Sequence, residues 1–176
     1  MDNKYNIEFK IASVDDVKAI NSLVNSVYRG ENSKKGWTTE ADFLGGIRIT
    51  EEKIKEIIGR KNDIVILAVF EGNITGCVHL ENAGEYSYLG MLSVDVDHQD
   101  KGIGRLLINE CERYTKEEWK LRKIKMKVIN RRLELMEYYY RRGYKTTGEI
   151  EEFVPGEETF GNPTEKLYFE TLSKEL

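Results

Sequence analysis

The chain has 176 residues, of which 40% are hydrophobic and 33% are charged, with a formal net charge of -4. This length and composition are typical of one globular domain spanning residues 1–176, and they exclude a disordered chain. Charges of both signs are interspersed along the sequence. We therefore expect no nucleic-acid partner, because such a partner favours a basic patch.

No apolar run approaches the roughly 18 residues of a membrane span, and residues 1–5 begin no apolar stretch, so we expect neither a membrane segment nor a signal peptide. The two cysteines, Cys77 and Cys111, have no C-x-x-C spacing and predict neither a metal site nor a disulfide framework. A cytoplasmic location is the default expectation. The sequence leaves the oligomeric state open, with a homodimer among the options.

The first third of the chain predicts a strand and two helices. Alternation over residues 7–11 indicates a strand, and the apolar positions of residues 17–27 fall on one helical face. A polar, glycine-containing stretch follows from 29 to 48. Thr50 is expected to cap a short helix that has Gly59 in the C′ position.

The rest of the chain predicts six strands and two helices. The strands are residues 64–70, 74–80, 86–96, 124–129, 144–149 and 166–171, and the helices are 103–119 and 133–142. The order is β-α-α-β-β-β-α-β-α-β-β. The strand-helix-strand-helix passage in the middle requires parallel pairing there, and the hairpins around it require a mixed sheet. The fold class is α+β (α/β).

A glycine turn, Gln99-x-x-Gly102-x-Gly104, lies directly between a strand and a helix. Glycines allow backbone N–H groups to converge on a phosphate, and the helix dipole behind them favours an anion. A Rossmann fingerprint would need a third glycine where Leu107 stands, and a Walker A loop would need Gly-Lys-Ser/Thr. The alternative is a plain glycine turn that starts a helix.

Two motifs resemble one family. The run from Met91 to Leu107 resembles motif A of the GNAT acetyltransferases, and the run from Tyr138 to Tyr144 is similar to their motif B, aromatic-Tyr-x-x-x-Gly-aromatic. The order of elements is similar as well. The resemblance implies a twisted, mostly antiparallel sheet flanked by helices, whose central parallel strand pair is splayed to hold acetyl-CoA, and an N-acetyltransferase activity that uses acetyl-CoA and no metal.

The resemblance also implies cofactor contacts. The backbone of Leu92, Ser93 and Val94 would pair with the pantetheine arm. Many family members carry an Asn seven residues before the motif B tyrosine, where this chain has Arg132, and Asn130 is the candidate for that contact. The pyrophosphate would be wrapped by Gln99, Asp100, Lys101, Gly102, Ile103, Gly104 and Arg105.

For the chemistry, Tyr139 occupies the position of the family's general acid, and with a reference pKa near 10 it is protonated at neutral pH. The alternative is aromatic packing on a core helix. Glu81 and Glu85 are the candidate bases, acting directly or through water. His79 is a further candidate, although a lone strand histidine is more often structural.

The stretch from Tyr28 to Phe43 would form one wall of the acceptor site in this family. Trp37 offers a stacking surface, while Glu40 and Asp42 are expected to receive an ammonium group. The alternative is a surface loop anchored by Trp37. This loop and the loop from Pro155 to Pro163 would enclose the site, which favours a small primary amine.

Direct attack in a ternary complex is expected, because both cysteines occupy core-like positions. Three alternatives stay open at this point: a catalytically silent CoA-binding or sensor protein, an N-acetyltransferase for proteins or peptides, and a transferase of a longer acyl group.

Overall fold

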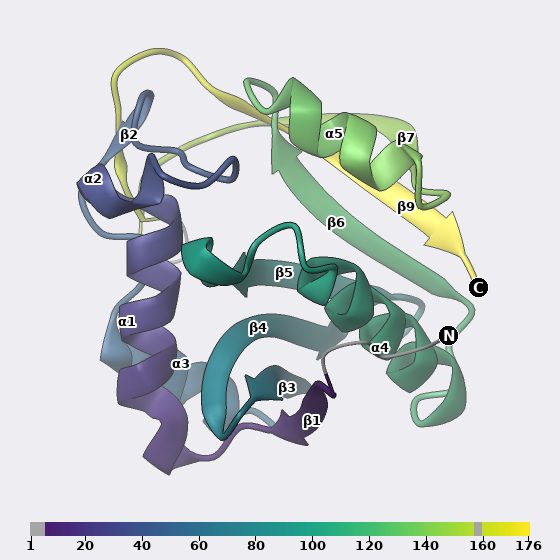
Figure 1. Ribbon diagram of the computed structural model, residues 1–176. Coiled ribbons are helices and arrows are strands. Elements are labelled where there is room, and N and C mark those ends of the chain that lie inside the picture. Colours follow the sequence, from purple (N-terminus) through teal and green to yellow (C-terminus); the bar gives the residue numbers. More distant parts are fainter. Residues whose placement is uncertain (1–5, 157–159) are drawn as a thin grey trace.

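The computed structural model describes residues 6–156 and 160–176 (Figure 1). The expectation of no signal peptide falls on residues 1–5, outside the described residues, as do residues 157–159 of the loop from Pro155 to Pro163. Within the described ranges, no helix is long and apolar enough to cross a membrane.

A seven-stranded sheet organises the fold, in the order β1-β3-β4-β5-β6-β9-β7. Its one parallel pair is β5 with β6, and every other neighbouring pair within the described sheet is antiparallel. The predicted mixed sheet is confirmed. The strands are β1 (Glu8–Ile11), β3 (Asp63–Phe70), β4 (Asn73–Asn82), β5 (Ser87–Val94), β6 (Lys123–Ile129), β7 (Lys145–Glu152) and β9 (Tyr168–Glu175).

The main helices cover both faces of the sheet. One face packs against α1 and α3, and the opposite face packs against α4 and α5. Figure 1 shows α4 lying across β4 and β5, with α5 over β6 and β9. The helices are α1 (Val17–Tyr28), α2 (Gly30–Ser33), α3 (Glu51–Gly59), α4 (Ile103–Glu117) and α5 (Leu133–Tyr140), with 3₁₀ turns η1 (Val14–Asp16) and η2 (Val96–His98).

The start of α3 is as predicted, and its end lies two residues later than predicted. The Thr50 hydroxyl accepts a hydrogen bond of 3.1 Å from the backbone N–H of Lys53, the contact expected of an N-cap. Gly59 is the last helical residue rather than C′, and Arg60 follows as the C-cap. The ends of a helix are the part that a periodic sequence pattern locates least well.

The polar stretch from 29 to 48 contains structure that periodicity does not reveal. It forms α2 and the short strand β2 (Leu44–Gly45), which pairs with β8 (Asn162–Pro163). This small sheet joins the two loops that were expected to enclose a site. Two segments this far apart in sequence pair only once the chain has folded. No local sequence pattern therefore predicts this pairing.

Gly76 sets how closely α4 approaches the sheet. A Cβ atom at this position would lie 2.9 Å from Cδ1 of Leu107, 3.1 Å from the carbonyl oxygen of Ser93 and 3.3 Å from Cγ2 of Ile103. Leu107 and Ile103 belong to α4 and are fully buried. The absence of a side chain at Gly76 therefore places the first turn of α4 directly against β4 and β5.

We predict that Gly76→Ala lowers the free energy of unfolding by about 1–3 kcal/mol, because a backbone carbonyl cannot move aside as a flexible side chain can. Gly59→Ala is the matched control. Nothing lies within 4 Å of a Cβ at Gly59, so that change should leave stability the same or raise it by up to about 1 kcal/mol. Urea unfolding of both variants measures the difference, and equal midpoints would show that the α4 contact is not tight.

Candidate functional site

β5 and β6 part from each other soon after they begin. They pair only through Ser87 with Ile124 and Tyr88 with Lys125. Figure 1 shows the two strands diverging beyond that point. Past Tyr88, the edge of β5 that faces β6 has no strand partner among the described residues. The carbonyls of Leu92 and Val94 accept from the Tyr28 hydroxyl and the Gln99 amide, and the remaining backbone groups of this edge are available to another molecule, which can add to the edge as a strand would.

A bulge in β5 lies at the parting. The register between β4 and β5 shifts between Cys77 and His79, and Met91 has a φ of 54°. The next residue, Leu92, has its carbonyl oxygen bound by the hydroxyl of Tyr28, which reaches across from α1. Bulges release backbone groups from the ladder and occur often beside functional sites.

The glycine turn begins α4 without a side-chain cap. Gly102 has a φ of 81°, in the left-handed region, and no side chain bonds the first N–H groups of the helix. Those groups have no acceptor within the helix itself. A Cβ at Gly104 would approach the Tyr138 hydroxyl to 3.1 Å, so a larger residue there would displace that hydroxyl slightly. The arrangement can accept an anion at the helix N-terminus.

A cavity of about 290 Å³ opens over this turn. Most of the residues predicted to contact the cofactor line it, namely Leu92, Val94, Gln99, Asp100, Gly102, Ile103, Gly104 and Arg105. Three others do not. Lys101 lies outside the lining, Ser93 is buried with its hydroxyl donating to the Met91 carbonyl at 3.1 Å, and Asn130 lies on the far side of β6 from the turn, against β9.

The Gln99 side chain holds the preceding loop rather than facing open space. Its amide nitrogen donates to the Thr38 hydroxyl and to the Val94 carbonyl, both at 3.1 Å, and its oxygen accepts from the Trp37 N–H at 3.2 Å. The Trp37 ring then lies 5.3 Å from that of Tyr138. Trp37 therefore lines the smaller cavity, at the turn, and not the acceptor wall on which it was predicted.

A second cavity, of about 470 Å³, lies on the α1 and α3 face of the sheet. Its walls come from the end of α1, from α3, and from β4, β5 and β6. It lies next to the smaller cavity, since the two share five lining residues: Tyr28, Leu92, Arg132, Leu135 and Tyr139.

Tyr139 is placed where the two cavities meet. Only 5% of the residue is exposed, and within the described part of the chain its hydroxyl has no hydrogen-bond partner. Burial raises the pKa of Tyr139 far above its usual value, and the nearby Tyr28 adds to the rise while Arg132 opposes it. The phenol is therefore protonated throughout the neutral range.

Arg132, and not Asn130, faces the junction. The Asn130 amide oxygen accepts from the backbone N–H of Tyr168 at 3.1 Å, which ties the end of β6 to β9. Arg132 lines both cavities, and its guanidinium donates to the Thr38 carbonyl at 2.7 Å. The sequence signal for this was already present, since Arg132 occupies the position seven residues before Tyr139.

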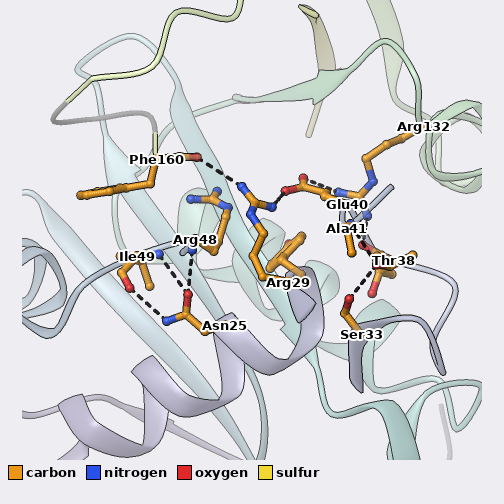
Figure 2. Close-up of polar contacts among 12 residues, drawn as sticks. Asn25, Arg29, Ser33, Thr38, Glu40, Ala41, Arg48, Ile49, Arg132 and Phe160 are labelled. Carbon is orange, nitrogen blue, oxygen red and sulfur yellow. Dashed lines mark hydrogen bonds and ion pairs between the residues drawn. The ribbon is translucent and has the colours of Figure 1, made fainter. Parts of the chain in front are cut away.

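Glu40 is buried between two arginines (Figure 2). One carboxylate oxygen accepts from Arg29 and the other from Arg132, the latter at 3.1 Å. The charge of this carboxylate is already balanced by two guanidinium groups. The geometry therefore does not support the role predicted for Glu40, which was to bind an ammonium group. Asp42 is exposed and lines neither cavity.

Two candidate bases share one strand face in the larger cavity. Glu81 is half-buried, and its carboxylate has no bond to any described residue. His79, two residues earlier, is bound through Nε2 to the buried carboxylate of Asp63 at 2.5 Å. Its Nδ1 is directed toward Gly90 on β5, 3.8 Å from where a Cβ would stand. Glu85 is exposed and outside the cavity.

Solved structures with this fold are acetyltransferases. The ribosomal-protein-S18-alanine N-acetyltransferase of Escherichia coli superposes with a TM-score of 0.71 and 10% identity, covering 96% of this chain and 93% of that one. The spermidine/spermine N-acetyltransferase of Vibrio cholerae gives 0.69 and 17%, covering 98% and 95%. A Bacillus anthracis protein assigned as a streptothricin acetyltransferase, in complex with acetyl coenzyme A, gives 0.56 and 20%, covering 69% and 66%.

These identities show a shared fold, and no curated protein matches the sequence itself significantly. The family is shown by the sequence. The model of the Acetyltransferase (GNAT) family matches residues 24–144, which is more than half of the chain and includes the parting strands, the glycine turn and Tyr139. The chain therefore belongs to the GNAT family of N-acetyltransferases, enzymes that use acetyl-CoA as the acetyl donor.

Proposed function

We propose that this enzyme moves the acetyl group of acetyl-CoA to the primary amine of a small molecule, by direct attack, with Tyr139 as the general acid. The observation that carries the proposal is the meeting of two cavities at the Tyr139 hydroxyl. One cavity has the anion-binding turn expected for the donor. The other, of about 470 Å³, lies within the usual range for small-molecule sites.

In this proposal the donor lies in the smaller cavity. The free edge of β5, from Leu92 through Ser93 to Val94, pairs with the pantetheine arm through its backbone. The turn from Gln99 to Arg105 takes the pyrophosphate on the amides at the start of α4, with Lys101 contributing backbone only. Arg105 and Arg142, which both line this cavity, supply positive charge. Arg132 takes the junction position first considered for Asn130.

The reaction forms an N–C bond and breaks the C–S bond of the thioester. The neutral amine attacks the carbonyl carbon, and backbone N–H groups at the Leu92 bulge are suitably placed to bind the carbonyl oxygen as it becomes negative. The departing sulfur takes the proton of the Tyr139 hydroxyl. That transfer needs a basic thiolate, and the burial that raises the pKa of Tyr139 also makes a thiolate beside it more basic.

The amine must lose a proton, and Glu81 is the proposed acceptor. Its carboxylate faces the larger cavity and has no partner among the described residues. His79 is the rival, because Asp63 fixes its ring with Nε2 bound and Nδ1 free to accept. His79 pairs with Gly90 and Glu81 with Tyr88, so His79 stands two residues closer to the bulge along the sheet.

A small acceptor is favoured over a protein because the two loops over the larger cavity are joined. The β2–β8 pair connects them, and the Arg29 guanidinium donates to the Phe160 carbonyl at 3.2 Å. A peptide acceptor needs an open groove. A silent CoA-binding protein is disfavoured by the free hydroxyl of Tyr139, since such a protein has no need for a buried, unbonded acid at the junction.

For the acid, we predict that Tyr139→Phe lowers kcat by about 10²-fold or more while leaving the affinity for acetyl-CoA near that of the wild type. Tyr140→Phe is the matched control, since Tyr140 is the neighbouring tyrosine on α5 and lines neither cavity. Steady-state kinetics and calorimetry provide the two readouts. Equal turnover by both variants would show that Tyr139 contributes to packing and not to catalysis.

For the base, Glu81→Gln should lower kcat/KM by about 10²-fold or more at neutral pH, and the loss should shrink as the pH approaches the pKa of the amine, which then deprotonates unaided. His79→Gln keeps a donor toward Asp63 and is the paired variant. A pH-rate profile of both decides the assignment. If only His79→Gln shows the pH-dependent loss, the Asp63–His79 pair is the base and Glu81 is not.

Neither cysteine is suited to carry the acetyl group. Both are buried, and burial raises the pKa of Cys77 to about 12 and that of Cys111 well above its usual value. We predict intersecting initial-rate plots, no acetyl-cysteine after incubation with acetyl-CoA, and an unchanged kcat in the folded Cys77→Ala, Cys111→Ala double variant. Parallel plots with an acetylated cysteine would establish a relay instead. Thermal unfolding of the double variant measures the stability lost with the cysteine side chains, and so distinguishes that loss from a loss of catalysis.

A further inference from the structure

The larger cavity contains an excess of buried positive charge. The guanidinium groups of Arg29 and Arg132 share one carboxylate, that of Glu40, and no second carboxylate among the described residues binds either of them. Arg48 adds a third guanidinium to the same wall. Arg29 and Arg132 are almost completely buried and Arg48 is half-buried, and cations in such places are costly unless anions balance them.

The other cations of the cavity, Lys53, Arg60 and Lys127, have acid partners. Lys127 pairs with Glu151. Lys53 and Arg60 both pair with Glu56, and Lys53 and Arg60 each have a further interaction. Among the cations of the cavity, Arg29 and Arg132 therefore share the single carboxylate of Glu40, and Arg48 pairs with no carboxylate of the described residues.

Arg48 is the member whose guanidinium has no acid partner. Among the described residues its one charge-related contact is the face of Tyr28, with Cζ 5.4 Å from the ring centroid. Its backbone is held firmly all the same. The Asn25 side chain accepts from the Arg48 N–H at 2.7 Å and donates to the Ile49 carbonyl at 3.0 Å. Figure 2 shows the Arg48 side chain extending from this clamp toward Arg29.

Arg48 is linked to the bulge at Leu92 through the side chain of Tyr28. Tyr28 separates it from the junction, since the Arg48 guanidinium covers the ring of Tyr28 while the hydroxyl of that ring bonds to the Leu92 carbonyl. Arg48 and Leu92 both line the larger cavity. A small molecule in that cavity can therefore contact Arg48 at one end and the bulge at the other.

We propose that the acceptor is an amine that also carries an acid group, a carboxylate or a phosphonate, and that Arg48 binds this acid. The inference rests on the proposed acetyl transfer and names its substrate class. A guanidinium binds either oxyacid through two parallel hydrogen bonds. The amine end lies toward Glu81 and the bulge, so the cavity offers one unpaired cation and one unpaired carboxylate to a molecule with both charges.

The position of Tyr88 supports this polarity. Burial raises the pKa of Tyr88 to about 12, and Arg48 lowers that pKa while Glu81 raises it. Arg48 and Glu81 therefore both act on the hydroxyl of Tyr88, which lines the same cavity, and they act with opposite sign. A polyamine, which has only ammonium groups, would bring a second cation against Arg48.

The test uses an acceptor panel in which the amine is kept and the acid is varied. Free-thiol release from acetyl-CoA is measured with amino acids, their carboxamides, the matching aminophosphonates and spermidine. The carboxylate or the phosphonate acceptor should exceed its uncharged amide by about 10- to 100-fold in kcat/KM, the scale of a hydrogen bond to a charged group. The better of the two acids identifies which oxyacid the site takes.

Arg48→Gln should raise KM for the acid-bearing acceptor by about 10- to 100-fold, leave kcat and acetyl-CoA affinity within a few-fold, and remove the preference over the amide. Arg48→Lys should restore part of it. Arg131→Gln is the control, since Arg131 is exposed and pairs with Glu165 away from the cavity. An equal loss for acid and amide in Arg48→Gln would overturn the inference, as would a wild-type enzyme indifferent to the acid.

Calorimetry with the desulfo-CoA complex separates this inference from the proposed function. If acid-bearing amines bind the complex in an Arg48-dependent manner but none is acetylated, the transfer reaction fails while the acid-binding site stands. If amides and acids are acetylated equally well, the transfer reaction stands and the acid-binding site is wrong.

Discussion

The carboxylate of Glu40 connects parts of the chain that the parting of β5 and β6 would otherwise leave separate. Through Arg29 it reaches the end of α1, and through Arg132 it reaches the start of α5, on the two sides of the gap. All three side chains are almost completely buried. Breaking such a cluster by removing one member leaves an uncompensated charge in a poorly solvated place, which is strongly unfavourable. The geometry of both cavities depends on this contact.

The same cluster links the two cavities to each other. Arg132 donates to the Thr38 carbonyl, and the Thr38 hydroxyl accepts from Gln99, which belongs to the glycine turn. A continuous path of polar contacts therefore runs from the start of α4 to the wall of the larger cavity. A group bound at the turn and a molecule bound beside Glu40 would meet the same loop. This arrangement explains why Glu40 is a buried residue in a loop that is otherwise largely polar.

The fold by itself selects no acceptor. The structures that superpose on this chain include an enzyme named for an alanine of a ribosomal protein and one named for spermidine and spermine, at 10% and 17% identity. Folds of this kind support many substrates, because the site residues vary while the sheet is kept. In the function proposed for this chain, the residues that would distinguish one amine from another are those that line the larger cavity, among them Arg29, Arg48 and Arg132.

Local patterns were sufficient to predict most of the framework. Alternation and helical periodicity located the strands and helices, and the turn from Gln99 to Gly104 and the tyrosine four residues before Gly143 could be recognised because each depends on neighbours in sequence. The roles assigned to these residues stay predictions. The mixed sheet with its parallel pair followed from the order of elements alone, because a helix between two strands returns the chain in the same direction.

Only the tertiary structure decided what surrounds the reacting centre. Glu40 pairs with an arginine 92 residues away, Trp37 is drawn to the glycine turn by a side chain 62 residues away, and β2 finds its partner in β8. Arg48 carried no signal at all, since an arginine in a polar loop is ordinarily a solvated charge. The physical reason is common to all four. The charge balance and contacts of a buried side chain depend on residues that only folding brings together.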